Sequence, residues 1–336
     1  MRTLLALLGA VLMVVAALVF RATVIEGGDD GGGSGGGTAR LVCATEVGDA
    51  CDDLAGDGVS VTVEPAGVTA ARLSSITDQA ARDPGLDGWL VPAPWPDLVR
   101  ATRDQAGLGP VIDDSVGPVA RSPLAIAVWS ERVPTLDAEC DDIDWRCVGE
   151  VARSGGVQPS FPDPATSATG RDVLGQVATS YFGRSDISSF DVNTDQGFRI
   201  FLDALADSSA AVPPGADPLD LMLSTGGAQV DVVGAFEAQA CPTLAEAARG
   251  DEVMLIYPAP VATAELEFAP VTRAGGADRL EDRVTGGDGE NALVDTGWHV
   301  ADDGPDCESP DVARGSNLPS AGVLQVLSDL WAQVNR

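Results

Sequence analysis

The feature that most constrains the fold of this chain is the alternation of short apolar segments, which are typical of strands, with segments of helical spacing. This alternation limits how the strands and helices can pack into layers. Residues 40–45 (RLVCAT), 59–63 (VSVTV) and 86–91 (LDGWLV) are short runs rich in apolar or β-branched residues, which are typical of strands. Residues 68–81 and 96–106 have apolar side chains at helical spacing and are predicted to be helices. This order predicts a parallel sheet with right-handed crossovers, and ligands of such sheets bind beyond the carboxyl ends of the strands.

The same alternation continues through the rest of the body. Residues 122–129 (SPLAIAVW) form a continuous apolar run, which predicts a central strand. Further strands are predicted at 157–161, 229–236 and 253–257, and further helices at 144–154, 169–182, 195–206, 219–224, 237–248 and 320–335. The body is therefore predicted to be α/β throughout.

The charge of the chain excludes several classes of partner. Its 336 residues include 51 Asp and Glu against 20 basic residues, all of them Arg, and the formal net charge is −31. Nucleic-acid binding needs a basic surface, so nucleic acid and anionic lipid are poor candidates. Two interpretations of the charge stay open: it maintains solubility, or it attracts a cation or a cationic partner.

The N-terminus resembles a membrane anchor. Residues 3–20 are uncharged and almost wholly apolar, and their length reaches the lower end of the ~17–25 residues that span a membrane. A cleaved secretory signal has a shorter apolar core of ~7–15 residues, and the sequence around Arg21 is a poor cleavage site. We therefore predict a transmembrane signal anchor at residues 1–25, with a cleaved signal as the alternative. In either case the body lies outside the cytoplasm, so we expect a single-pass cell-membrane protein.

A Gly/Ser-rich linker follows the anchor. Residues 26–38 have a composition that behaves as a flexible coil, so they are predicted to tether the body to the membrane.

The cysteines agree with export. An even number of cysteines in an exported chain favours disulfides over free thiols. The six are Cys43, Cys51, Cys140, Cys147, Cys241 and Cys307. Fifteen pairings are possible; we pair Cys140 with Cys147 first, then Cys43 with Cys51, which leaves Cys241 with Cys307. A zinc site is the weaker alternative, because the sequence has no Cys-x-x-Cys and a single His.

The order of the segments resembles the type II extracellular solute-binding proteins that supply ABC importers. The likeness covers residues 40–334 and depends on RLVCAT, LDGWLVPAPWPDLV, ARSPLAIAVW, FPDPATSATGRDVL, QVDVVGAFEAQA and EVMLIYPAPV, in that order. A looser similarity links the chain to the solute-binding-like part of actinobacterial surface proteins that also have a von Willebrand type A domain. EVMLIYPAPV looks like the family's strand that returns to the first lobe.

The resemblance implies a two-lobed, periplasmic-binding-protein-like (type II) α/β fold. Its two parallel or mixed sheets are expected to be flanked by helices and joined by two crossover strands. Residues 39–119 and 259–336 would form lobe 1, and residues 120–258 would form lobe 2. The family's oxyanion-binding branches have a row of hydroxyl residues after the first strand, whereas this chain has Thr45 and Glu46, and the Glu46 carboxylate weakens an anion assignment.

Residues at predicted strand ends and at one helix start are candidates for ligand binding. The segment 163–170 (DPATSATG) ends at a helix start, whose N–H groups suit a carboxylate or an oxyanion, unless Ser167 or Thr169 only caps the helix. Trp95 either stacks on a ligand or packs in the core, and Glu237 either pairs with a ligand cation or starts its helix. The candidates are Thr45, Glu46, Trp95, Ser122, Thr166, Ser167, Thr169, Glu237 and Tyr257, the last being a cleft or hinge residue.

Catalysis is not expected. The single histidine, His299, lies in a strand-like apolar setting (GWHV) and is predicted to pack rather than to act as a base. No Ser-His-Asp or Cys-His constellation, phosphate-binding loop, metal site or cofactor site is predicted. We expect a protein that captures a small ligand between its lobes for an ABC importer. The alternative is a non-transport adaptor or sensor of the cell envelope, whose partner is another envelope protein.

Overall fold

The computed structural model describes residues 37–77, 83–213, 215–301, 304, 307 and 316–335. The chain divides into two units, Met1–Gly37 and Thr38–Arg336, and the second unit contains the whole described fold. The predicted anchor and nearly all of the predicted linker lie outside the described residues. In the part of the chain that is described, no helix is long and apolar enough to cross a membrane.

Eight strands form the sheet of the described body. They are β1 (Ala39–Ala44), β2 (Val59–Glu64), β3 (Gly88–Pro92), β4 (Val116–Trp129), β5 (Pro159–Ser160), β6 (Val232–Phe236), β7 (Val253–Ile256) and β8 (Thr263–Pro270). Their order is β2-β1-β3-β8-β4-β6-β5, and β7 pairs separately with β4. The pairs β1–β2, β1–β3 and β5–β6 are parallel, whereas β8 and β4 run antiparallel to their partners, so the sheet is mixed.

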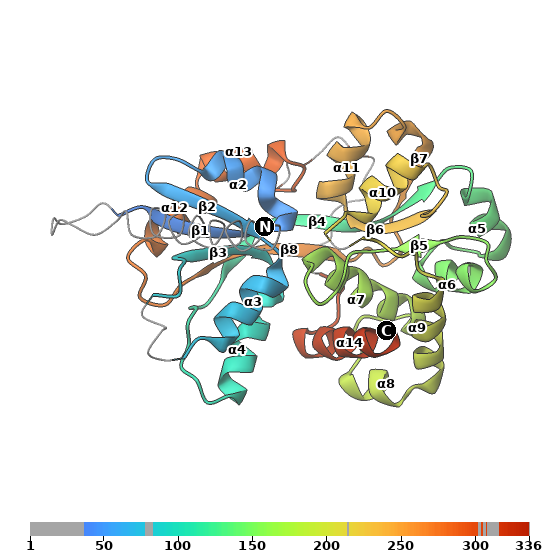
Figure 1. The fold of residues 1–336 in the computed structure, drawn as a ribbon, viewed down its shortest axis with the longest axis horizontal. Coiled ribbons are helices and arrows are strands. Elements are labelled where there is room, and N and C mark those ends of the chain that lie inside the picture. The colour runs from blue at the N-terminus through green and yellow to red at the C-terminus, as the bar shows by residue number, and fades with distance from the viewer. Residues whose placement is uncertain are drawn as a thin grey trace, which may run out of the picture. The chain divides into compact units, whose positions relative to one another are not determined.

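Helices flank this sheet. They are α2 (Gly48–Leu54), α3 (Ala66–Ser75), α4 (Trp95–Gln105), α5 (Val133–Glu139), α6 (Trp145–Arg153), α7 (Ala168–Phe182), α8 (Ser189–Thr194), α9 (Gln196–Ser208), α10 (Pro218–Thr225), α11 (Glu237–Glu246), α12 (Ala277–Thr285), α13 (Gly287–Asp295) and α14 (Ala321–Val334), with 3-10 turns η1 (Thr45–Val47) and η3 (Gly250–Glu252). We name β1, β2, β3, α2, α3, α4, α12 and α13 the β1 side, and β5, β6, β7 and α5 to α11 the β6 side. Figure 1 shows the two sides joined by β4 and β8.

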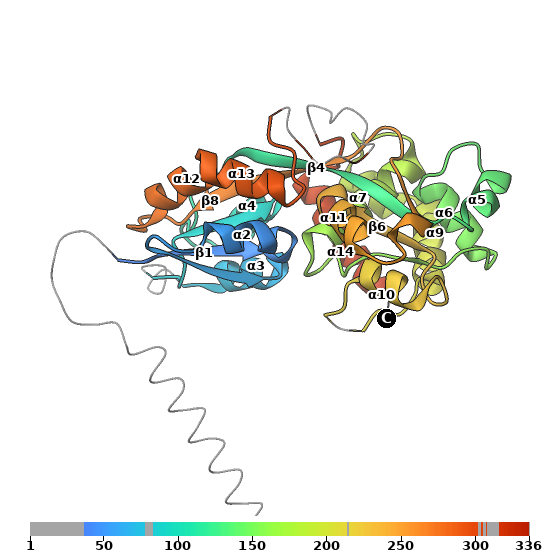
Figure 2. The ribbon, with the colours of Figure 1, turned by 90° about the horizontal axis from the view of Figure 1, so that it is seen from above.

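Strand β4 belongs to both sides. Its first part pairs with β8, for example Ser122 with Ala264, and its last part pairs with β6 and β7, for example Val128 with Val232 and Met254. The prediction of an α/β fold with mixed sheets flanked by helices is confirmed. The strands nevertheless form one continuous path, because β4 passes from one side to the other (Figures 1 and 2).

The returning strand is β8, which the sequence analysis missed. The segment that resembled the returning strand, EVMLIYPAPV at residues 252–261, contains β7, which pairs with β4 on the β6 side. The chain then returns through β8, whose sequence TAELEFAP alternates buried residues with the half-buried Glu265 and Glu267. Helices α5, α8, α12 and α13 were also not predicted, whereas the predicted strand 157–161 is reduced to the two residues of β5. The predicted helix 68–81 ends at Ser75, and the described residues do not include 78–82.

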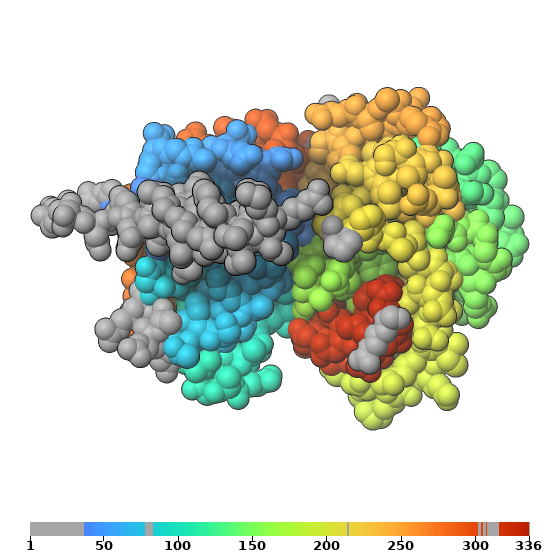
Figure 3. Space-filling view, viewed as in Figure 1, coloured from blue at the N-terminus to red at the C-terminus, as the bar shows by residue number. Residues whose placement is uncertain are grey.

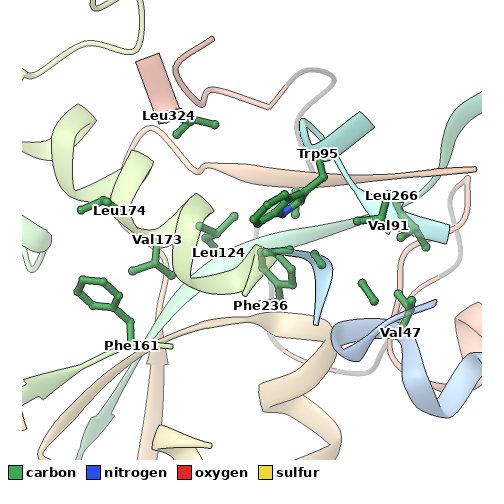
Figure 4. Close-up of a cluster of buried hydrophobic side chains, with 14 of the residues drawn as sticks. Val47, Val91, Trp95, Leu124, Phe161, Val173, Leu174, Phe236, Leu266 and Leu324 are labelled. Atoms are coloured by element: carbon green, nitrogen blue, oxygen red, sulfur yellow. The ribbon is translucent and has the colours of Figure 1, made fainter. Parts of the chain in front are cut away.

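One apolar core continues from the β1 side to the β6 side. It includes Leu41 of β1 and Val232 of β6 in the same cluster of buried side chains. Figure 4 shows part of it, with Leu124 and Phe236 close to Val173 of α7. Helix α14 packs on α7, α8 and α9 and also contacts α4. The predicted boundaries between the lobes stay a prediction.

All three predicted disulfides are present. Cys43–Cys51 links β1 to α2, Cys140–Cys147 links the end of α5 to α6, and Cys241 of α11 is bonded to Cys307. The described part of the chain has no free cysteine.

We expect loss of the Cys241–Cys307 bond to destabilise the protein most. Replacing both cysteines by Ser removes a cross-link over 66 residues, which is predicted to lower the free energy of unfolding by about 4 kcal/mol. The matched control, Ser at Cys140 and Cys147, removes a cross-link over 7 residues and is expected to cost about 2 kcal/mol. Urea unfolding of both variants measures the difference, and equal losses would contradict the loop-closure explanation.

Candidate ligand-binding cleft

Two adjoining cavities lie between the β1 side and the β6 side. The smaller has a volume of about 300 Å³ and the larger about 640 Å³. They share Thr45, Glu46, Pro162, Thr169, Asp217, Pro218 and Gln239, so we treat them as one space, the central cleft. Figure 3 shows the blue surface of the β1 side and the yellow and green surface of the β6 side meeting along a furrow.

The cleft lies at the carboxyl ends of strands from both sides. Thr45 directly follows β1, Pro162 lies two residues after β5, and Ala238 lies two residues after β6. This is the place where ligands bind in open α/β sheets, as the sequence predicted.

Glu46 crosses the cleft and meets the N-terminus of α7. Its Oε1 accepts hydrogen bonds from the backbone N–H of Ala168 (2.7 Å), the backbone N–H of Thr169 (3.2 Å) and the hydroxyl of Ser167 (2.8 Å). Its Oε2 accepts a hydrogen bond from the hydroxyl of Thr45 (3.2 Å). Only 6% of Glu46 is exposed, so the helix N-terminus is covered by this carboxylate. The arrangement is the favourable one for a negative charge at the positive end of a helix dipole.

Ser167 caps α7, which is one of the two roles that the sequence left open, and it also contacts a carboxylate of the chain. Its hydroxyl accepts a hydrogen bond from the N–H of Gly170 (3.1 Å), which caps α7, and donates one to a carboxylate. That carboxylate belongs to Glu46 rather than to a ligand. The Thr169 hydroxyl donates to Oε1 of Gln239 (2.7 Å), and the Thr166 carbonyl accepts from the N–H of Gly67 (2.9 Å).

The lining of the smaller cavity is acidic. Its carboxylates are Glu46, Asp49, Asp217, Asp220 and Glu246, and none of the residues that line it is basic. A positively charged ligand would therefore meet an attractive potential, and an anion a repulsive one.

Trp95 and Ser122 do not line the central cleft. Trp95 is buried, and the guanidinium of Arg171 in α7 lies 4.0 Å from the centre of its ring. Burial lowers the pKa of Arg171 to about 10. The Ser122 hydroxyl is fully buried, accepts from the N–H of Ala238 (3.0 Å) and donates to the carbonyl of Pro123 (3.2 Å). Trp95 thus lies between the two sides, whereas Ser122 lies in β4 and contacts the first turn of α11.

Glu237, Tyr257 and His299 form a group of their own around the buried Glu237 carboxylate. The Tyr257 hydroxyl donates to Oε2 of Glu237 (2.5 Å), and Nε2 of His299 lies 2.6 Å from Oε1. Burial and the neighbouring Glu237 carboxylate raise the pKa of Tyr257. Both oxygens of Glu237 therefore have partners within the protein. The sequence predicts His299 to be a packed residue and does not reveal this contact, which spans 62 positions of the chain.

Asp172 of α7 is a further buried polar group that the sequence analysis missed. Among the described residues, neither of its carboxylate oxygens has a hydrogen-bond partner, and the side chain is fully buried. Burial, opposed by Arg171 and reinforced by Glu46, raises the pKa of Asp172 well above its usual range. On the same face of α7, Gln176 accepts a hydrogen bond from the indole N–H of Trp145 (2.9 Å).

No protein-family model matches the sequence, and a search of curated proteins found no match. The structure resembles solved periplasmic binding proteins. A periplasmic thiamin binding protein matches with a TM-score of 0.61 and 14% identity over 92% of this chain and 100% of that one. AfuA from Actinobacillus pleuropneumoniae, with fructose-6-phosphate bound, matches at 0.57 and 13% over 90% and 97%. The sulfate-binding protein SubI from Mycobacterium tuberculosis H37Rv matches at 0.53 and 16% over 88% and 91%.

These neighbours are type II periplasmic solute-binding proteins, and the likeness establishes a periplasmic-binding-protein-like fold for this chain.

We expect Asp172 to make stability depend on pH. The raised pKa in the folded state means that folding favours the protonated form of Asp172. The contribution of Asp172 to the free energy of unfolding is therefore complete below the ordinary aspartate pKa of about 3.9, and it is lost as the pH rises above that value. Asp172→Asn should therefore gain stability relative to the wild type between about pH 4 and 7, by up to about 1.4 kcal/mol per pH unit. Urea unfolding across this range measures the gain. The control is Asp104→Asn, at an exposed position of α4; parallel profiles for all three proteins would contradict the prediction.

Proposed function

We propose that this chain is an extracytoplasmic solute-binding protein that captures a small ligand in the central cleft. The supporting observation is the position of the cleft, which is lined from both sides at the carboxyl ends of β1 and β5 and at the start of α11. Its cavities, about 300 and 640 Å³, fall in the range of small-molecule sites, about 300–1,000 Å³.

The proposed ligand is small and cationic, or polar without negative charge. Four carboxylates besides Glu46 line the smaller cavity, from Asp49, Asp217, Asp220 and Glu246, and no basic side chain joins them there. These carboxylates attract a cation electrostatically. Because the cavity is partly buried, solvent and salt screen this attraction less than they would at an open surface.

The proposed partner is the permease of an ABC importer. The solved neighbours include proteins named for thiamin and sulfate binding, so the fold suits the capture of solutes of different chemistry. We further propose that residues 1–25 anchor the chain in the cell membrane as a single span and that residues 26–38 tether the body outside it. The apolar run at residues 3–20 and the Gly/Ser-rich composition of the linker support this part of the proposal.

Titration of the extracytoplasmic body, residues 38–336, tests the binding function. Trp298 lines the smaller cavity, so a ligand there is expected to change tryptophan fluorescence. The probes are choline, putrescine and arginine, with sulfate as the anionic comparison. We expect at least one cation to bind and Asp220→Asn to weaken it about three- to fivefold, the usual effect of one exposed charge pair. Glu150→Gln, at an exposed position of α6 outside the cleft, removes the same charge and is the control. No response to any cation would oppose the proposal.

A second candidate is an adaptor or sensor of the cell envelope that does not transport. The observation that favours it is Glu46, which covers the helix N-terminus where a ligand's carboxylate would otherwise bind. Cross-linking of the full-length chain in its own membrane distinguishes the two. A permease among the cross-linked partners supports transport, and another envelope protein without any permease supports the adaptor.

A further inference from the structure

The single histidine of the chain lies at a second contact between the two sides of the body, next to β4. We propose that His299 and Glu237 form a pH-sensitive contact between the β1 side and the β6 side. A proton taken up by His299 converts a neutral hydrogen bond into an ion pair, which holds the two sides together more firmly. The inference goes beyond the proposed function, since it does not depend on a ligand in the central cleft.

His299 belongs to the segment that follows α13 of the β1 side. Its backbone N–H donates to the carbonyl of Arg121 in β4 (2.8 Å), and its carbonyl accepts from the N–H of Arg121 (2.8 Å). Arg121 pairs with Glu265 of β8 and lies three residues before Leu124, where the pairing of β4 with β6 begins. The backbone of His299 is therefore fixed to β4 where this strand passes from one side to the other.

Glu237 reaches His299 from the β6 side. It is the first residue of α11, directly after β6, and it is fully buried. Its Oε1 lies 2.6 Å from Nε2 of His299, and its Oε2 accepts a hydrogen bond from the hydroxyl of Tyr257 (2.5 Å). The imidazole thus connects an element of the β1 side to a buried carboxylate of the β6 side.

The residues that precede and follow this pair also meet across the two sides. The rings of Trp298 and Phe236 pack edge to face, with their centres 6.0 Å apart. Gly297 has a φ of 93°, and a Cβ there would lie 2.8 Å from the carbonyl oxygen of Ala238. The pair is therefore part of a continuous interface, and its strength contributes to how firmly the two sides are joined.

The strength of the contact depends on the charge of the imidazole. Histidine is the side chain whose charge ordinarily changes between pH 5 and 8. A neutral imidazole donates one N–H to Glu237, whereas a protonated one also places a positive charge against the buried carboxylate. A hydrogen bond between charged groups is roughly twice as strong as a neutral one. Because 14% of the His299 side chain is exposed, protons from the solvent reach the ring.

Few other charges face His299 from the elements packed around it. Arg121 of β4 forms an ion pair with Glu265 of β8 (3.4 Å), and Asp295 at the end of α13 is exposed. Among the described residues, the carboxylate of Glu237 is the only charged group within hydrogen-bond distance of the imidazole. The charge of His299 therefore acts mainly on Glu237.

Tyr257 does not titrate in the same range. Burial and the neighbouring Glu237 carboxylate raise the pKa of Tyr257, so its hydroxyl keeps its proton and continues to donate to Oε2. The hydrogen bond on that oxygen is thus the same at pH 5.5 and at pH 8.0, and only the bond on Oε1 changes.

Melting temperatures of the full-length chain and of His299→Gln, at pH 5.5 and at pH 8.0, test the inference. Gln keeps a side-chain N–H but takes up no proton in this range. We expect the wild type to exceed the variant by about 3 °C more at pH 5.5 than at pH 8.0, the shift that corresponds to one partly exposed ion pair. Asp172 is present in both proteins, so its own pH dependence cancels from the comparison. An equal difference at the two pH values overturns the inference.

Amide hydrogen exchange in the first turn of α11 separates the local contact from global unfolding. After correction for the intrinsic exchange rates, protection of residues 237–240 in the wild type is expected to be about threefold greater at pH 5.5 than at pH 8.0. In His299→Gln the protection is expected to be the same at both pH values. A change of equal size in both proteins contradicts a role of the histidine.

Tyr257→Phe is the matched control. It removes the donor to the other oxygen of Glu237 and leaves His299 in place. We expect it to melt below the wild type at both pH values and to keep the pH dependence of the wild type. If Tyr257→Phe lost that dependence as completely as His299→Gln, general loss of packing would be the cause and the inference would be overturned.

Glu237→Gln covers the case in which His299→Gln does not fold. It keeps an oxygen beside Nε2 of His299 and removes the negative charge, so the pH dependence of the melting temperature is expected to be lost as well. Persistence of the wild-type pH dependence in whichever of the two variants folds refutes the inference.

Discussion

One charged contact links the two sides of the body at the N-terminus of α7. Glu46 spans the gap between the β1 side and the β6 side, and its carboxylate accepts three hydrogen bonds at the start of α7. The helix N-terminus is satisfied in this way, and the apolar core continues from one side to the other. The same contact occupies the N–H groups of Ala168 and Thr169 at the start of α7.

Much of the fold follows from local sequence patterns. The short apolar or β-branched runs that form β1, β2, β3, β6 and β7 are correctly predicted, because each has a clear apolar pattern and is bounded by turn residues. β8 was missed because its two glutamates, Glu265 and Glu267, dilute the apolar signal, although its period of two is visible. α12 and α13 were missed because each has only three apolar side chains (Ala, Leu and Val) among its nine residues, and both helices pack against elements of the β1 side.

The sequence allowed us to select candidate site residues from their type and position, but it did not show which residues would hydrogen-bond to each other. Thr45, Glu46, Ser167 and Thr169 were selected because they lie at strand ends and at a helix start, and the structure brings them together. That Glu46 itself fills the helix N-terminus was not predictable, because the contact joins residues more than 120 positions apart. The same limit applies to the group of Glu237, Tyr257 and His299. Its members lie on separate segments, and only the folded chain shows that they hydrogen-bond to one another.

The Cys43–Cys51 bond has a consequence for the chemistry of the cleft. Its covalent ring contains η1, and therefore Glu46, between a strand and a helix of the β1 side. An oxidising compartment thus supplies part of the rigidity with which this carboxylate reaches across to α7. In a reducing medium the ring opens, the backbone around Glu46 gains conformational freedom, and the carboxylate is held in place less firmly. The redox state of Cys43 and Cys51 is in this way connected to the contact between the β1 side and α7.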